Sequence, residues 1–361
     1  MKICFLAPAT SIHTKKWCKF FNEKGNEVHV ISFVDGRIEN VTVHYVPVAA
    51  DAAGSDFEKI LYLFQAKKVR DIINQIQPDI VNAHYATSYG AVAALSGIKN
   101  YVLSVWGSDI YDFPQRSFAH KLLLQFSLNR AQYLFSTSKA MADEARKYTK
   151  KDFTITPFGV DTELFNPNKR TRCDDSLFVI GTVKALSYKY GIDYLLKAVA
   201  IIHNAHPDIP LKLRIAGKGE NESDFKSLAE KLGIADITTW LGFISQEEAA
   251  KEWANMDVAI VYSSYESFGV SAVEAQACGV PLIVSDVPGL LEATRPEETS
   301  FVVKKNNEYE LAKSIMILYK NEKLRKKMGN EATMFISHTY EYMQCFKIIE
   351  DAFSDIKKKR D

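Results

Sequence analysis

Long apolar runs, surplus charge and paired cysteines are all scarce in this 361-residue sequence. No apolar run approaches the roughly 18 residues of a membrane-spanning helix. A formal net charge of +1 argues against a protein that binds nucleic acid through a basic surface. The five cysteines are odd in number and form no Cys-x-x-Cys pair, which is typical of a reduced cytosolic protein and points away from a cysteine metal site.

Two glycine motifs for nucleotide phosphates are also missing. No Gly-x-Gly-x-x-Gly follows the first apolar run, which argues against a nicotinamide-dependent dehydrogenase. Gly217 and Gly219 in "IAGKGE" form a strand-exit turn, but no Gly-Lys-Ser/Thr follows them, so this is not a P-loop. We interpret Ile3–Ala7 in "MKICFLAPA" as a buried first strand rather than a signal peptide, whose apolar core is usually longer.

What the sequence does contain is a repeated rhythm of short β-rich runs and longer helical stretches, within a composition typical of a globular protein. The length allows two domains of about 150 residues each. The rhythm predicts an α/β fold with two Rossmann-like, doubly wound parallel sheets. The expected strands are Ile3–Ala7, Val28–Phe33, Asp79–Ala83, Tyr101–Val105, Tyr133–Ser136, Phe153–Thr156, Leu177–Gly181, Leu211–Ala216, Thr238–Leu241, Val258–Val261, Leu282–Ser285 and Phe301–Val303.

The domain boundary is expected in the polar segment "NPNKRTRCDDS", which contains Pro167 and has no apolar periodicity. We therefore predict a first domain over 1–166 and a second over 167–339. The tail over about 340–361 has apolar residues at helical spacing, which predicts a helix that packs back on the first domain. Ligands of doubly wound sheets bind beyond the carboxyl ends of the strands, so the chemistry should come from strand-to-helix loops of both domains, across a cleft.

A Gly-containing turn with an acid on each side stands in "YESFGVSAVEAQACGVP", residues 265–281. Glu266 is at the tip of a loop after a strand, Gly269 permits close backbone approach to a ligand, and a helix begins around Val270. The free N–H groups of that helix start make an anion site between two hydroxyl-binding carboxylates, which suits a nucleotide sugar. Alternatively, Glu266 and Glu274 are acids favoured near a helix start by the macrodipole.

The longer stretch "YESFGVSAVEAQACGVPLIVSDVPG" resembles the E-x7-E signature of family 4 glycosyltransferases, which are retaining enzymes of GT-B fold. The resemblance covers nearly the whole chain, because "PDIVNAHYATSYGAVAAL", "LFSTSKAMADEA", "FGVDTELFNP", "IGTVKALSYKYGIDYLLKA" and "LRIAGKGE" follow in the family's order. Many members read "GRLxxxKG" where this chain has "TVKALSYKYG".

This resemblance implies a set of donor contacts in the second domain. It implies that Glu266 holds a hydroxyl of the donor sugar and that Glu274 holds the ribose hydroxyls. The pyrophosphate would meet the backbone of the turn, and the nucleotide would lie near two further strand-exit turns. The remaining donor-binding candidates are therefore Ser267, Phe268, Gly269, Val270, Gly217, Gly242, Phe243 and Ile244.

The resemblance also implies that Lys184 and Lys189 hold the diphosphate. Cleavage of a glycosyl–phosphate bond develops negative charge on the leaving oxygen, which two preplaced cations stabilise. Lys184 replaces the commoner arginine, so bidentate contact is lost while the charge is kept. The alternative is two solvated surface lysines. The catalytic candidates are therefore Lys184, Lys189 and Glu266. No enzyme nucleophile is assigned, since family 4 enzymes are thought to use front-side attack.

No metal or other cofactor is expected. The chain has no Asp-x-Asp pair, which enzymes of the other large glycosyltransferase fold use to bind a divalent ion. A UDP-sugar is favoured as the donor substrate, with a GDP-sugar as the alternative.

The first domain supplies candidates for the cleft and the acceptor. Trp106 in "SVWGSDIY" stands where many relatives have a histidine, so it either stacks on a sugar or belongs to the core. Asp109 keeps the family position and either binds acceptor or orients the loop. His13 and Thr14 follow the first strand, and His84 ends another, where an ordinary structural role is the alternative for each.

We expect a hexosyltransferase that acts on a glycan or lipid-linked acceptor in surface polysaccharide or glycoconjugate synthesis, in the cytoplasm. A nucleotide-sugar epimerase of the same fold and a catalytically silent nucleotide-sugar-binding protein are the alternatives. Two basic amphipathic stretches, 113–128 and Ile60–Ile73, could lie on the inner face of the membrane. An ordinary domain helix with a solvated basic face is the favoured interpretation of both.

Overall fold

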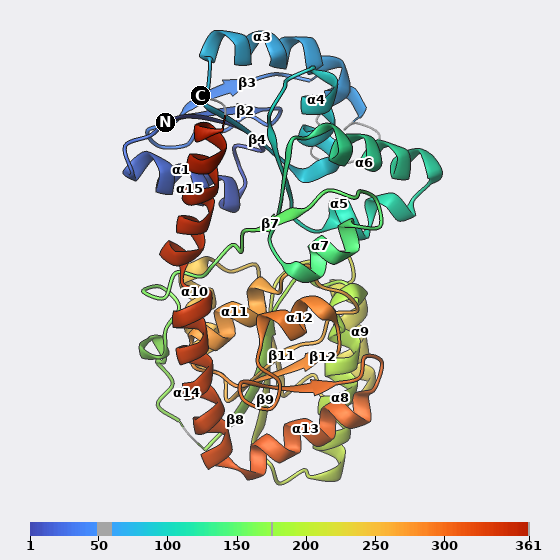
Figure 1. Ribbon diagram of the computed structural model, residues 1–361. Coiled ribbons are helices and arrows are strands. Elements are labelled where there is room, and N and C mark those ends of the chain that lie inside the picture. The colour runs from blue at the N-terminus through green and yellow to red at the C-terminus, as the bar shows by residue number, and fades with distance from the viewer. Residues whose placement is uncertain (49–59, 175, 360–361) are drawn as a thin grey trace. The chain divides into compact units, whose positions relative to one another are not determined.

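A computed structural model describes residues 1–48, 60–174 and 176–359 (Figure 1). The chain divides into two compact units, one formed by Met1–Phe158 with Cys345–Asp361 and the other by Gly159–Gln344. The boundary predicted at 166/167 therefore lies a few residues too late. Pro167 begins a short 3-10 helix inside the second unit rather than a linker.

The first unit is built on a parallel sheet that, in its described residues, has seven strands in the order β3-β2-β1-β4-β5-β6-β7. The strands are β1 (Lys2–Leu6), β2 (Glu27–Ser32), β3 (Thr42–Tyr45), β4 (Ile80–His84), β5 (Val102–Val105), β6 (Tyr133–Ser136) and β7 (Phe153–Ile155). The described helices are α1 (Ile12–Glu23), η1 (Ile60–Gln65), α3 (Ala66–Ile76), η2 (Tyr85–Tyr89), α4 (Gly90–Leu95), α5 (Ser108–Tyr111), η3 (Phe113–Gln115), α6 (Phe118–Arg130) and α7 (Lys139–Ala145).

The second unit repeats this plan with six parallel strands among its described residues, in the order β10-β9-β8-β11-β12-β13. The strands are β8 (Phe178–Val183), β9 (Leu211–Ala216), β10 (Thr238–Gly242), β11 (Val258–Val261), β12 (Leu282–Ser285) and β13 (Ser300–Val303). Its helices include η4 (Pro167–Lys169), η5 (Tyr188–Tyr190), α8 (Ile192–Ala205), α9 (Glu222–Lys231), α10 (Gln246–Ala254), α11 (Val270–Ala277), α12 (Pro288–Ala293), α13 (Glu308–Lys320) and α14 (Glu322–Thr339).

Both sheets have the doubly wound topology that the alternating pattern predicted. In each sheet the first strand is central, the next two strands are added on one side of it, and the later strands are added on its other side. The reversal falls between β1 and β4 in the first sheet and between β8 and β11 in the second. The crevice at the carboxyl end of such a strand pair is where open α/β sheets bind their ligands.

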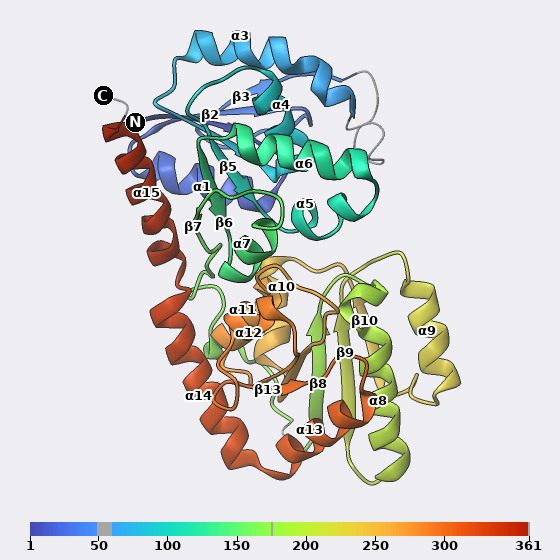
Figure 2. The same ribbon diagram turned by 45° about the vertical axis from the view of Figure 1, so that its right-hand side comes forward.

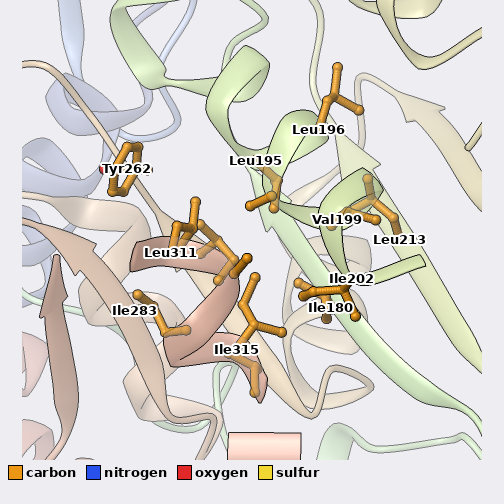
Figure 3. Close-up of a cluster of buried hydrophobic side chains, with 14 of the residues drawn as sticks. Ile180, Leu195, Leu196, Val199, Ile202, Leu213, Tyr262, Ile283, Leu311 and Ile315 are labelled. Atoms are coloured by element: carbon orange, nitrogen blue, oxygen red, sulfur yellow. The ribbon is translucent and has the colours of Figure 1, made fainter. Parts of the chain in front are cut away.

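The core of the second unit forms where the apolar faces of its helices pack against the buried strands. In α8 the apolar residues Leu195, Leu196, Val199 and Ile202 recur at helical spacing, and all are buried. They pack with Leu311 and Ile315 of α13 and with strand residues such as Ile180, Leu213 and Ile283 (Figure 3). This packing supports β8 and its neighbours beneath the loops that follow them.

The tail forms α15 (Tyr342–Lys358), whose buried residues are those of the predicted apolar face: Cys345, Phe346, Ile349, Phe353 and Ile356. The Phe346 ring lies 5.1 Å from that of Phe20, and the Phe353 ring lies 5.3 Å from that of Phe21. Both partners are on α1, so residues 345–359 complete the core of the first unit. Among the described residues, no helix is long and apolar enough to cross a bilayer.

Candidate active site

The loops that leave β8, β9, β10 and β11 are tied together by hydrogen bonds. These are Lys184 N–H to Ala216 O at 2.9 Å, Gly217 N–H to Gly242 O at 2.7 Å, Ser264 N–H to Lys189 O at 2.7 Å, and Ser271 Oγ–H to Val183 O at 3.0 Å. The predicted donor-site loops of the second unit therefore form one connected edge, centred on the point where the strand order reverses.

Two glycines allow these loops to approach one another. Gly217 has a φ of 136°, and a Cβ atom there would stand 1.9 Å from the carbonyl oxygen of Lys184. Gly269 has a φ of 83° at the N-cap of α11, a left-handed conformation that side chains disfavour. The turn before α11 and the contact between the β8 and β9 loops both depend on the missing side chain.

A buried ion pair joins the ends of β8 and β11. Lys184 Nζ lies 2.7 Å from Glu266 Oε2, and each side chain is only 12% exposed. Ser263 Oγ–H donates to the same carboxylate oxygen at 3.1 Å. Burial acts to raise the pKa of Glu266, but the ammonium of Lys184 and these hydrogen bonds lower it overall. Burial acts to lower the pKa of Lys184, yet the Glu266 carboxylate raises it overall. Both groups are therefore charged at neutral pH.

Lys189 stands beside this pair among aromatic rings. Its Nζ lies 3.9 Å from the centroid of the Tyr265 ring and 5.5 Å from that of Tyr190. Lys184 Nζ lies 4.7 Å from the same Tyr190 ring. Since ring faces attract cations, Tyr190 and Tyr265 hold the two ammonium groups in place without neutralising them. The structure thus brings Lys184, Lys189 and Glu266 together.

The helix expected after the Gly-containing turn is α11, and it begins at Val270 as the sequence predicted. Its first N–H groups have no acceptor within the helix, so they are suited to an anion. Glu274 is half-buried on α11, and its Oε2 lies 3.5 Å from Nε1 of Trp253 on α10. The side chain of Phe268 is buried against Tyr340, so only its backbone could serve a ligand. Ser267 is half-buried in the same turn.

The end of β10 is connected to this edge through β9. Gly242 accepts the hydrogen bond from Gly217, whereas Phe243 is 76% exposed and Ile244 is half-buried.

In the first unit, the aromatic candidates form a packed cluster. The His13 ring stacks 4.0 Å from that of Phe158 and meets Trp106 edge-on at 5.7 Å. Burial, with a smaller effect of Lys16, lowers the pKa of His13 to about 4, so it is neutral at physiological pH. Trp106 is buried, which favours the core interpretation of this residue.

Thr14 and His84 are fully buried. The His84 ring lies 4.2 Å from that of Trp106, and its Nε2 lies 3.0 Å from Asn82 Oδ1. The aromatic cluster therefore covers His84 at the end of β4, which favours the structural role for this residue.

Asp109 orients loops rather than facing solvent. Its buried carboxylate accepts backbone N–H groups from Ala86 at 2.9 Å, Gly107 at 2.8 Å and Trp106 at 3.2 Å. It thereby ties the loop after β4 to the loop after β5. Burial raises the pKa of Asp109, although the three backbone donors oppose that effect.

Known proteins match the chain over most of its length. Residues 167–335 match the family described as Glycosyl transferases group 1, and residues 2–138 match the family described as Glycosyl transferase 4-like. The chain belongs to the group 1 glycosyltransferases. It shares 26% identity with an uncharacterized glycosyltransferase of Methanocaldococcus jannaschii, over 92% of this chain and 91% of the relative. It shares 31% identity with a D-inositol 3-phosphate glycosyltransferase of Pseudarthrobacter chlorophenolicus, over 71% of this chain and 66% of that protein.

The fold of this glycosyltransferase is GT-B. A solved structure of the Anabaena protein HepE, in complex with UDP and glucose, superposes with a TM-score of 0.80 at 18% identity, covering 98% of this chain and 100% of the other. The expectations of family and fold class made from the E-x7-E stretch are therefore confirmed.

Sequence reasoning missed four residues that contact members of the candidate site. Tyr190 and Tyr265 hold the lysines, Ser263 donates to Glu266, and Trp253 approaches Glu274. The two tyrosines could have been found, because each adjoins a candidate in "YKY" or "YES". Trp253 left no signal, since only folding brings α10 beside α11.

Proposed function

We propose that this glycosyltransferase moves a hexose from a nucleotide-sugar to a glycan or lipid-linked acceptor, with retention of anomeric configuration and without a metal ion. The observation that supports this most is the buried Lys184–Glu266 pair, with Lys189 beside it, at the switch point of the second sheet. An acid that binds a sugar hydroxyl and two cations that bind a diphosphate are what such a donor requires.

In this proposal the residues position the donor, and its own phosphate takes the proton. Glu266 accepts a hydrogen bond from a hydroxyl of the donor sugar, and Glu274 accepts from the ribose. Lys184 and Lys189 bind the diphosphate and stabilise the charge on its oxygen as the glycosyl–phosphate bond breaks. The acceptor oxygen bonds to the anomeric carbon on the same face, and its proton passes to the departing phosphate.

A UDP-hexose is the proposed donor, with a GDP-sugar as the alternative. The likeness to a protein solved with UDP and glucose supports this choice. The acceptor is proposed only as a broad class. One relative is named for D-inositol 3-phosphate, which is neither a glycan nor a lipid-linked acceptor. We propose surface polysaccharide or glycoconjugate synthesis inside the cell, with peripheral contact at the inner face of the cytoplasmic membrane.

The experiment is a thermal-shift series with UDP-, GDP- and ADP-glucose on the full chain. A donor present at a hundred times its Kd adds about 2.7 kcal/mol to the folded state, so the melting temperature should rise by several degrees. Lys189→Ala should lose this rise, whereas Lys197→Ala, on α8, should keep it. The proposal fails if no nucleotide-sugar raises the melting temperature.

A product assay separates transfer from its alternatives. With donor and acceptor present, NMR should detect a new glycosidic bond of the same anomeric configuration as the donor. An epimerised donor formed without acceptor would identify an epimerase. Donor binding with no product from a panel of hydroxyl acceptors would identify a binding protein.

A further inference from the structure

The helix α6 has two apolar faces. One face, with Leu124 and Leu128, is buried in the core of the first unit, where α6 packs beside α4 (Figure 2). The other carries Phe118, Leu122 and Phe126, which are 74%, 48% and 42% exposed. The sequence had predicted one apolar and one basic face, but folding divides the apolar residues between the core and the surface.

The exposed residues form a continuous stripe. They recur at every fourth position, which places them on one side of the helix, over about 12 Å of its length at 1.5 Å per residue. We call Phe118, Leu122 and Phe126 the α6 stripe. Two bulky phenylalanines and a leucine exposed together are uncommon on the surface of a monomer and indicate an interaction site.

The charged residues of α6 itself are all basic. Lys121 and Arg130 are exposed and, on a helical projection at 100° per residue, lie on opposite flanks of it. From 113 to 142 the sequence contains no Asp or Glu, whereas it contains Arg116, Lys121, Arg130 and Lys139. An apolar stripe between basic flanks matches a bilayer surface, where rings enter the acyl boundary and cations meet anionic headgroups.

We propose that the α6 stripe, with Lys121 and Arg130, is the surface by which this protein binds an anionic membrane. The inference deepens the proposed peripheral attachment and names its surface. A second copy of the chain is a poorer occupant, because a two-fold contact would bring the same basic flanks together with no acid in 113–142 to pair with them.

The test is flotation of the full chain with vesicles of equal parts phosphatidylcholine and phosphatidylglycerol. The protein should float with these vesicles, and less with phosphatidylcholine alone or at high salt. Phe118→Ser should weaken binding roughly tenfold through lost apolar burial. Lys121→Glu with Arg130→Glu should weaken it at least about tenfold, given about 1 kcal/mol per basic residue.

Matched controls lie in the second unit, where Tyr309→Ser removes another exposed aromatic side chain and Lys231→Glu another exposed lysine. Both should float like the unaltered protein. A triple variant replaces Phe118, Leu122 and Phe126 by serine. The inference is overturned if the unaltered protein does not float with anionic vesicles, or if the triple variant floats as well as the unaltered protein. It is also overturned if the unaltered protein is a dimer and the triple variant is a monomer. Because the thermal shift with UDP-glucose should be unchanged in every variant, failure here is distinct from failure of the proposed transfer.

Discussion

The ion pair between Lys184 and Glu266 should be strongly coupled energetically. At their separation of 2.7 Å, two unit charges attract by about 6 kcal/mol at an effective dielectric constant of about 20. The desolvation of each group cancels in a double-mutant cycle, and coupling free energies between contacting residues reach about 3 kcal/mol, which is the value we expect here. Exposed pairs give about 0.2–1 kcal/mol.

A double-mutant cycle measures this coupling. Glu266→Gln and Lys184→Met keep the approximate shape of each side chain, and the free energy of unfolding is measured for both single variants and the double variant by urea titration. Each single variant should be strongly destabilised because it leaves one buried charge, and the double variant should recover much of the loss. The control cycle uses Lys197 and Asp193, a more exposed pair at 3.3 Å on one helix. A Lys184–Glu266 coupling no larger than that of the control would refute the reasoning.

The pH range of this experiment follows from the two pKa shifts. The pKa of Glu266 is lowered, so its contribution is present above the ordinary glutamate pKa and is lost as pH falls through the lowered value. The pKa of Lys184 is raised, so its contribution is present below the ordinary lysine pKa and is lost as pH rises through the raised value. The coupling should therefore be constant around neutral pH.

Three other predictions address function and framework. Lys189→Ala should lower kcat about 10²–10³-fold with the urea midpoint nearly unchanged. Glu266→Ala should lower kcat by as much, and it should also lower the urea midpoint because it leaves the buried Lys184 without its partner. Near wild-type turnover in either variant would overturn the site. Gly217→Ala should destabilise the second unit by more than about 3 kcal/mol, because its Cβ would clash with Lys184 O, whereas Gly233→Ala, with open space around it, should cost only about 1 kcal/mol of backbone strain. Turnover should be the same with and without EDTA, and loss of activity that added divalent metal restores would contradict metal-free transfer.

Much of the fold was predictable because parallel strands buried on both faces leave short continuous apolar runs. Twelve predicted strands correspond to twelve of the thirteen in the described residues, with small shifts at the ends. The strand that was missed, Thr42–Tyr45, lies at the edge of the first sheet and is only partly buried. It therefore has no apolar run to reveal it.

The local sequence also specified the turn before α11, since Gly269 and the start of the helix at Val270 depend on neighbours in the chain. Contacts between segments distant in the sequence could not be predicted in this way. Lys184 and Glu266 are 82 positions apart, and only the adjacency of β8 and β11 makes them an ion pair. For Trp106 and His84 the sequence left both a ligand contact and a structural role open, and only the fold shows that both are buried with their rings 4.2 Å apart.

Periodicity and motif order were enough to predict a doubly wound α/β chain of the group 1 glycosyltransferases. The apolar pattern of each strand or helix, and each family motif, lies within a short stretch of the sequence. Which side chains meet, which are buried, and which apolar residues of α6 remain outside were decided by tertiary packing. The physical reason is that the exposure and charge environment of a side chain depend on elements brought beside it from elsewhere in the chain.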